Sequence, residues 1–340
     1  ECRRQRQMCI RDSIMTDHCL VEAVNLALAR AMSEDEDVIL LGEDIARNGG
    51  VFRATDGLLD SFGEDRVIDT PLAETAIAGV CIGLAAEKLR PVAEIQFSGF
   101  LYPCIDQLAN HASRFRTRTR GRLTCPMVIR TPSGGGIHAP EHHSESMEAM
   151  LINIPGIRVV FPSSPQRAYG LLLSAIRDPD PVVFFEPTRL YRSPKERVED
   201  NGQGLALDCC FILKSGADVT VISWGAMLKE AMAAALSVEA EGIHAEVIDV
   251  ATLKPIDFGT ILNSVRKTGR AIIVQEAPLT GGFGAEIAAR IAEHAILSLL
   301  APVRRLAAYD IVMPLPRLER HNIPDEQRIT AAIRNIMSYT

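Results

Sequence analysis

Strand-like and helix-like segments alternate along most of this chain, and that alternation constrains its fold more than any other feature. Helical periodicity from Leu20 to Met32 is followed by the buried-strand run VILLGEDI, residues 38–45. Further apolar strand runs lie at 90–97, 125–132, 157–164 and 181–187, with helical segments at 71–86, 100–115 and 168–178 between them. This order predicts an α/β fold, a parallel sheet with helices on both faces.

A second α/β unit follows an interruption between about 190 and 213, where the sequence becomes charged and contains glycines. Its expected strands are DVTVISWG, AEVIDV and AIIVQEA, each followed by a helix. We predict a first domain at 15–192, a linker at 193–212 and a second domain at 213–340, each domain with its own core. Residues 1–14 do not fit the periodic pattern, and we interpret them as a tail or an artefact of the sequence.

The composition argues against two classes of partner. The formal net charge is −7, whereas nucleic-acid-binding proteins usually carry a basic surface, and the alternate arginines of RFRTRTRGR, residues 114–122, indicate a solvated or partner-facing edge. No apolar run approaches the roughly 18 residues of a membrane span, so a soluble protein is expected. Eight cysteines without a CxxC pair indicate reduced thiols in a reducing compartment.

One carboxylate stands at the start of an apolar helix in DTPLAETAIAG, residues 69–79. Thr70 is a suitable N-cap and Pro71 a suitable first helical residue, and the following AIAGVCIGLAA has no polar face. A helix that is apolar all round is normally buried, which predicts that Glu74 lies at or near the interior. Glu74 is either a first-turn acid favoured by the helix dipole or a functional group with a partner.

Two further segments place polar groups in loops after strands, where α/β sheets usually bind ligands. Glu43 and Asp44 follow the strand at 38–42, and they either contact a ligand or simply start a turn. The glycine run Gly134 to Gly136 precedes His138, Glu141, His142 and His143. Glycines let a ligand approach the backbone, and a nearby histidine can move protons at neutral pH.

Two alternative sites also fit parts of the sequence. His138, His142 and His143 with Glu141 or Glu145 offer enough donors for a metal, although the helical HExxH spacing is absent. GGFG at 281–284 imitates a dinucleotide fingerprint, but Ile287 takes the third glycine position, which favours a packing turn.

Five long motifs occur in a specific order: DTPLAETAIAG, RPVAEIQFSGFLYPCIDQL, GGGIHAPEHHSES, IRDPDPVVFFEPTRLYR and TGGFGAEIA. Together they closely resemble the β subunit of the thiamine-diphosphate-dependent E1 component of 2-oxo acid dehydrogenase complexes, from about residue 18 to the C-terminus. The resemblance implies a transketolase-like pyrimidine-binding domain followed by a transketolase C-terminal domain.

The resemblance also implies roles for individual residues. The family glutamate at the position of Glu74 hydrogen-bonds N1′ of the cofactor's aminopyrimidine, and a carboxyl group in a dry pocket is suited to share a proton with a ring nitrogen. Phe100 falls on the aromatic position that packs on the pyrimidine, where some relatives have tyrosine. His143 falls on a histidine that helps in proton transfer or lipoyl delivery. Glu43 is the further cofactor-binding candidate.

Family members also hold a structural monovalent cation, mainly through backbone carbonyls, and the resemblance implies a K⁺ ion here. The matching positions are Cys125, Met127, Val128, Ala175, Asp178 and Asp180. Cys125 and Ala175 differ from some relatives in their side chains, which carbonyl ligation tolerates.

A diphosphate-Mg²⁺ motif that begins GDG and ends in Asn is absent from the sequence. An α subunit is therefore expected to hold Mg²⁺ and the diphosphate, in an α2β2 heterotetramer that passes the acyl group to a lipoyl arm of E2. The substrate is open between a branched-chain 2-oxo acid and pyruvate, with acetoin third. Rival functions are a nicotinamide-dependent oxidoreductase and a catalytically silent scaffold. The expected location is the bacterial cytoplasm, or the mitochondrial matrix in a eukaryote.

Overall fold

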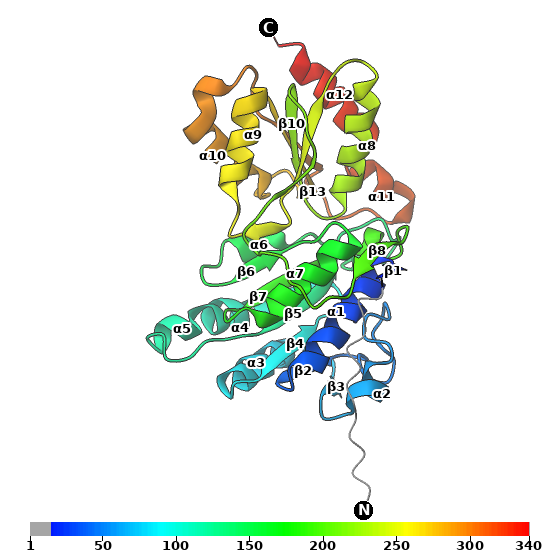
Figure 1. Cartoon of the computed structure of the whole chain (residues 1–340), viewed down its shortest axis with the longest axis vertical. Helices are drawn as coiled ribbons and strands as arrows, with labels where there is room; N and C mark the ends of the chain where they lie inside the picture. The colour runs from blue at the N-terminus through cyan, green and yellow to red at the C-terminus, as the bar shows by residue number, and fades with distance from the viewer. Residues whose placement is uncertain (1–14, 340) are drawn as a thin grey trace, which may run out of the picture.

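The computed structural model describes residues 15–339, and the predicted tail at 1–14 lies outside the described residues. Two sheets, each with helices on both faces, follow one another along the long axis of the molecule (Figure 1). The predicted α/β fold class is confirmed. Within residues 15–339, no helix combines the length and the apolar character needed to cross a bilayer.

The first sheet has seven strands in the order β12-β6-β7-β5-β4-β2-β3. They are β2 (Val38–Gly42), β3 (Val67–Asp69), β4 (Arg90–Glu94), β5 (Val128–Ser133), β6 (Arg158–Val160), β7 (Val182–Pro187) and β12 (Thr252–Lys254). Neighbours pair in parallel except β12, which runs antiparallel to β6. β12 belongs by sequence to the second unit, so this unit contributes an edge strand to the first sheet.

Helices cover both faces of this sheet because its strand residues alternate between two apolar clusters. Leu40 and Val92 join α1 (Leu20–Glu34) and α7 (Pro165–Arg177) on one side. Leu41 and Ala93 join the other side. The remaining helices of this unit are α2 (Leu58–Phe62), α3 (Glu74–Ala86), η1 (Ser98–Cys104), α4 (Ile105–Asn110), η2 (Ala112–Arg114), α5 (Phe115–Arg118), α6 (Glu148–Ile152) and η3 (Thr188–Leu190).

The second sheet has five strands in the order β14-β13-β10-β11-β9, of which β9 is antiparallel. They are β9 (Phe211–Lys214), β10 (Val219–Ser223), β11 (Ala245–Asp249), β13 (Ala271–Pro278) and β14 (Arg304–Ala308). In Figure 1, α8 (Met227–Glu239) and α12 (Glu326–Met337) lie on one side of this sheet, and α9 (Phe258–Thr268) and α10 (Gly284–Ala295) lie on the other. Two further short helices are η4 (Ile296–Ser298) and α11 (Pro316–Asn322).

One apolar cluster spans both units, whereas another lies in the second unit alone. A single cluster of buried side chains includes Leu101 and Phe185 of the first unit together with Trp224, Phe258 and Ile287 of the second. The carboxyl ends of the first sheet therefore face a second unit that is packed firmly against them.

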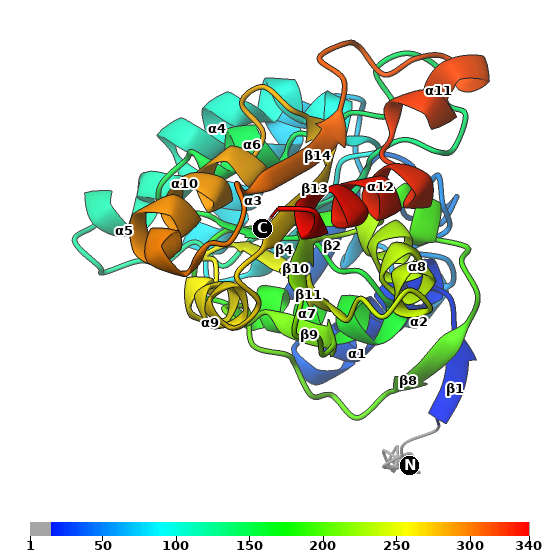
Figure 2. The same cartoon turned by 90° about the horizontal axis from the view of Figure 1, so that it is seen from above.

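The predicted linker at 193–212 contains regular structure. β8 (Glu196–Glu199) pairs antiparallel with β1 (Met15–His18) as a two-stranded ribbon at the edge of the molecule (Figure 2). β8 has no apolar strand pattern in the sequence, because Val198 is the one fully buried residue among its four residues and the other three are charged. The residue limits of the two domains stay a prediction.

Two predicted helices differ in detail. The helix after Thr70 begins at Glu74 with Ala73 as N-cap, because the Thr70 N–H bonds the Gly42 carbonyl at 2.9 Å and continues the pairing of β3 with β2. The single helix predicted at 100–115 is divided into η1, α4, η2 and α5. Pro103 lacks the N–H that a continuous α-helix requires, and His111 departs from helical dihedral angles.

Candidate functional site

The candidate site lies where β2 ends and α3 begins. Glu43 follows β2 directly and is only 7% exposed, and its Oε1 atom has no hydrogen-bond partner among residues 15–339. Burial raises the pKa of the Glu43 carboxyl, and the charge of nearby Glu74 raises this pKa further. Glu43 therefore favours its protonated form more than an exposed glutamate does.

Glu74 is held in place by η1. Cys104 Sγ donates to the Glu74 carbonyl at 3.2 Å, and Thr75 Oγ1 donates to the Pro103 carbonyl at 3.0 Å. Burial, with the charge of Glu74 next, raises the pKa of the Cys104 thiol to about 12, so this thiol remains a donor at neutral pH. Glu74 also lines a cavity of about 630 Å³ with Ala73, Thr75, Ala76, Gly79, Val80 and Gln107.

The prediction that α3 is buried all round is wrong for the single chain. Ile77 and Cys81 are fully buried on its inner face, whereas Val80 on the outer face is 52% exposed. Glu74 is half-buried at the border between the two faces. Because α3 has no polar face, its outer face is an apolar surface that residues 15–339 leave uncovered, beside the cavity of Glu74.

An aromatic cluster joins two of the predicted residues. The rings of Phe100 and His143 have centroids 5.2 Å apart, and Phe97 lies 4.5 Å from His143 and 5.8 Å from Phe100. The His143 Nδ1 atom is 2.9 Å from the Glu141 carbonyl. η1 carries both Phe100 and Cys104, so the same segment contacts Glu74 and His143. The structure thus gathers Glu43, Glu74, Phe100 and His143 at one edge of the sheet.

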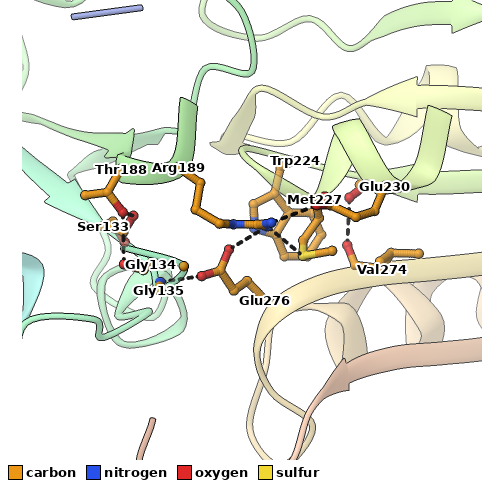
Figure 3. Close-up of polar contacts among 12 residues, drawn as sticks. Ser133, Gly134, Gly135, Thr188, Arg189, Trp224, Met227, Glu230, Val274 and Glu276 are labelled. Carbon is orange, nitrogen blue, oxygen red and sulfur yellow. Dashed lines mark hydrogen bonds and ion pairs between the residues drawn. The ribbon is translucent and has the colours of Figure 1, made fainter. Parts of the chain in front are cut away.

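The loop that carries His143 is held by the second domain. The Gly135 N–H donates to Glu276 at 2.6 Å, and Glu276 also contacts Arg189, which pairs with Glu230 at 2.7 Å (Figure 3). The backbone of the glycine run therefore binds a carboxylate of this chain. Glu276 was not predicted from the sequence, although a carboxylate at the end of the buried strand AIIVQEA was a usable signal.

A buried charge network lies beneath the site and was also missed. Arg130 donates to both oxygens of Glu186, at 2.7 and 2.8 Å, and contacts Glu94, and Tyr191 donates to Glu186. Arg130, Glu94 and Glu186 are each at most 3% exposed. Burial raises the pKa of Glu94 despite the opposing charge of Arg130. Charged residues inside the apolar strand runs were the sequence signal for this network.

The histidines do not converge on a metal. His138 Nδ1 lies 2.9 Å from Glu319, His142 stacks on Tyr102 with centroids 5.7 Å apart, and His143 joins the phenylalanines. Across residues 15–339, no three His, Cys, Asp or Glu side chains are grouped to hold a metal ion.

The residues of the predicted monovalent-cation site gather at the other end of β5. The Cys125 N–H donates to the Pro179 carbonyl at 3.1 Å, between Asp178 and Asp180. Both carboxylates are paired, Asp178 with Arg158 and Asp180 with Arg116, each at 2.8 Å. The carbonyl oxygens of Cys125, Met127 and Ala175 also accept hydrogen bonds, from the N–H groups of Met127, Val182 and Asp178 at 2.8, 3.0 and 3.3 Å. The cation site, which also includes Val128, stays a prediction.

The glycines of 281–284 accommodate a side chain of the same chain. A Cβ on Gly282 would lie 1.9 Å from Gln275 Nε2, and the Gly284 N–H donates to Gln275 Oε1 at 2.7 Å. Buried Gln275 thus occupies the turn, which supports the packing interpretation over dinucleotide binding.

Comparison with known proteins agrees with this architecture. Residues 19–194 match the transketolase pyrimidine binding domain family, and residues 210–329 match the transketolase C-terminal domain family. A split gene transketolase, described as an inactive beta4 tetramer, superposes with a TM-score of 0.79 at 23% identity, over 95% of this chain and 99% of that chain. A transketolase from Pichia stipitis gives a TM-score of 0.68 at 12% identity, over 97% of this chain and 47% of that chain. The fold is transketolase-like.

Closer relatives define the family within this class. The pyruvate dehydrogenase E1 component subunit beta of Acholeplasma laidlawii is 48% identical over 93% of this chain and 97% of that protein. Its counterpart in Bacillus subtilis is 46% identical over 96% of this chain and 100% of that protein. The chain belongs to the family of E1 β subunits of the 2-oxo acid dehydrogenases, as the motif resemblance predicted.

Proposed function

We propose that this chain is the β subunit of a pyruvate dehydrogenase E1 component, which decarboxylates pyruvate on thiamine diphosphate together with an α subunit. The substrate rests on relatives that are 45–48% identical and are named for pyruvate dehydrogenase. The observation that carries the function is the pair of neighbouring carboxyl groups Glu43 and Glu74, of which Glu74 lines a cavity at the border of an uncovered apolar helix face.

The residues of the site fit the aminopyrimidine half of the cofactor. Glu74 and Glu43 are the polar groups that would hold it, and Glu43 Oε1 has no other partner among the described residues. Phe100 would supply an aromatic surface, and His143 beside it would move a proton or meet the lipoyl group. When bound, thiamine diphosphate supplies the electron sink that decarboxylation of a 2-oxo acid requires.

The remaining half of the site is assigned to the α subunit. We expect it to hold Mg²⁺ and the diphosphate, to cover the outer face of α3, and to complete an α2β2 heterotetramer that reacts with the lipoyl group of E2. A K⁺ ion at the carbonyl oxygens near Cys125 and Ala175 would stabilise the base of β5. We also propose the domain limits 15–192 and 213–340 and a cytoplasmic location in a bacterium.

The experiment coexpresses the chain with its α subunit and measures decarboxylation of pyruvate and of 3-methyl-2-oxobutanoate, and cleavage of acetoin, at matched concentrations. The proposal expects pyruvate to give the highest kcat/KM. A preference for the branched-chain acid or for acetoin would move the chain to another member of the family, and no turnover of any of the three would refute the function.

A further inference from the structure

The loop that carries His143 closes on itself and packs against η1. It begins after β5 at Gly134, whose N–H returns to the Glu145 carbonyl at 3.1 Å, so residues 134–145 form a closed loop. Its tip contacts η1 closely, since a Cβ on Gly99 would lie 2.2 Å from the His142 carbonyl oxygen. A displacement of this loop would therefore displace the rings of His142 and His143.

Two carboxylates of the second domain bind the backbone at the start of this loop. Glu276 of β13 accepts from the Gly135 N–H at 2.6 Å. Glu319 of α11 accepts from the Gly136 N–H through Oε1 and from the His138 N–H at 3.2 Å through Oε2. Glu319 is 2% exposed, so its two oxygens meet these N–H groups in a nearly dry setting.

The glycines make this arrangement possible. A Cβ on Gly134 would lie 2.6 Å from Glu276 Oε1, and a Cβ on Gly135 would lie 2.9 Å from Glu319 Oε1. Gly136 has a φ of +85°, and a Cβ there would lie 1.9 Å from the side chain of Arg189. The glycine run is thus shaped to receive side chains that come from the second domain and from η3.

We propose that Glu276 and Glu319 are positioning residues, which hold the loop 134–145 and thereby set the place of His143 in the active site. This inference rests on the proposed function only for the role of His143, because the contacts themselves belong to the fold. The C-terminal domain would thus take part in the reaction, although the four predicted site residues, Glu43, Glu74, Phe100 and His143, all belong to the first domain.

The variants Glu319→Gln and Glu276→Gln test this assignment. Glutamine keeps the volume of the side chain but turns one acceptor oxygen into an NH2 donor. In Glu319→Gln this NH2 group must face a backbone N–H, and in Glu276→Gln it faces either the Gly135 N–H or the guanidinium of Arg189. Glu246→Gln is the matched control, because Glu246 is a fully buried carboxylate of the same domain that bonds Lys267 and Gly216. Thermal unfolding of all three variants identifies any that fails to fold. Glu319→Gln and Glu276→Gln are the two clamp variants, and if one of them fails to fold, the other still tests the proposal.

The first readout is hydrogen exchange of the peptide that spans 134–138, in the complex with the α subunit. Both clamp variants should exchange about tenfold faster than the wild type, and Glu246→Gln should not. Unchanged exchange in both clamp variants would overturn the proposal. This readout needs no catalysis, so it separates a failure of the clamp from a failure of the proposed function, which inactivity of the wild-type complex would reveal.

The second readout is a double-mutant cycle with His143→Ala. If the carboxylates act through His143, Glu319→Gln should lower kcat about tenfold in the wild-type background and should have no further effect in His143→Ala. Equal losses of kcat in both backgrounds would show an effect independent of His143 and would overturn the positioning role.

Discussion

The carboxyl group of Glu43 lies close enough to that of Glu74 for the charge of Glu74 to raise the pKa of Glu43, which burial raises first. Two acids at the edge of one sheet are unfavourable unless one of them keeps a proton or a cofactor separates their charges. A bound group that shares a proton with one of the two acids would therefore stabilise the pair.

Neutralising Glu74 should lower the pKa of Glu43. In Glu74→Gln the repulsion between the two carboxylates is absent, while the burial of Glu43 is unchanged, so Glu43 should ionise at lower pH. Carbon-13 NMR of chain labelled in glutamate side chains measures this titration, and Glu43→Gln identifies the resonance. An unchanged titration of Glu43 would show that the two carboxylates do not interact.

Removal of the Phe100 ring should weaken binding of the cofactor. Phe100→Ala deletes the aromatic surface and the contact with His143, and a stacking contribution of about 1 kcal/mol corresponds to roughly fivefold in affinity. The measurement is the concentration of thiamine diphosphate that gives half-maximal activity of the complex. Phe100→Tyr keeps the ring and should behave like the wild type; equal affinity in all three proteins would remove Phe100 from the site.

Loss of Arg130 should destabilise the first domain strongly. Arg130→Met leaves Glu94 and Glu186 buried without their cation, which costs about 3–5 kcal/mol of the free energy of unfolding. Urea denaturation of the isolated chain measures this change. Adding Glu94→Gln and Glu186→Gln to Arg130→Met should restore part of the loss, and a loss below about 1 kcal/mol would mean that the network is hydrated.

Glu148 should make the stability of the chain depend on pH. Burial raises its pKa to about 7, so between about pH 4.5 and about pH 7 the folded chain binds a proton that the unfolded chain has lost. The free energy of unfolding should fall as the pH rises through this window.

Glu148→Gln removes that dependence, since glutamine carries no charge at any pH. We expect the variant and the wild type to be equally stable near pH 4.5, and the variant to be more stable by about 3 kcal/mol at pH 8. Denaturation curves at both pH values test this, with the exposed Glu286→Gln as control. A difference that is independent of pH would contradict the raised pKa of Glu148.

The sequence predicted the sheets well where a local pattern determined the structure. Apolar runs such as those that form β2, β7 and β10 were recognised because strands buried on both faces are apolar throughout. β12 and β8 were missed because β12 gains its pairing from a strand of the other unit and β8 from the N-terminal β1.

Local sequence patterns likewise identified only some residues of the candidate site. Glu74 stands out within an apolar helix, and the motifs located Phe100 and His143. Glu276 and Glu319 could not be located from spacing alone, because they meet residues 135–138 only after two domains have packed together. The uncovered face of α3 could not be predicted either, because an apolar helix sequence does not show which face the same chain covers.

The most direct test of the account replaces Glu74 by Gln in the complex with the α subunit and measures decarboxylation of pyruvate. Glu87→Gln, at the exposed far end of α3, is the matched control. We expect Glu74→Gln to lose activity by about 100-fold or more while the complex still assembles, and Glu87→Gln to keep full activity. Full activity in Glu74→Gln would contradict the assignment of Glu74 to the cofactor.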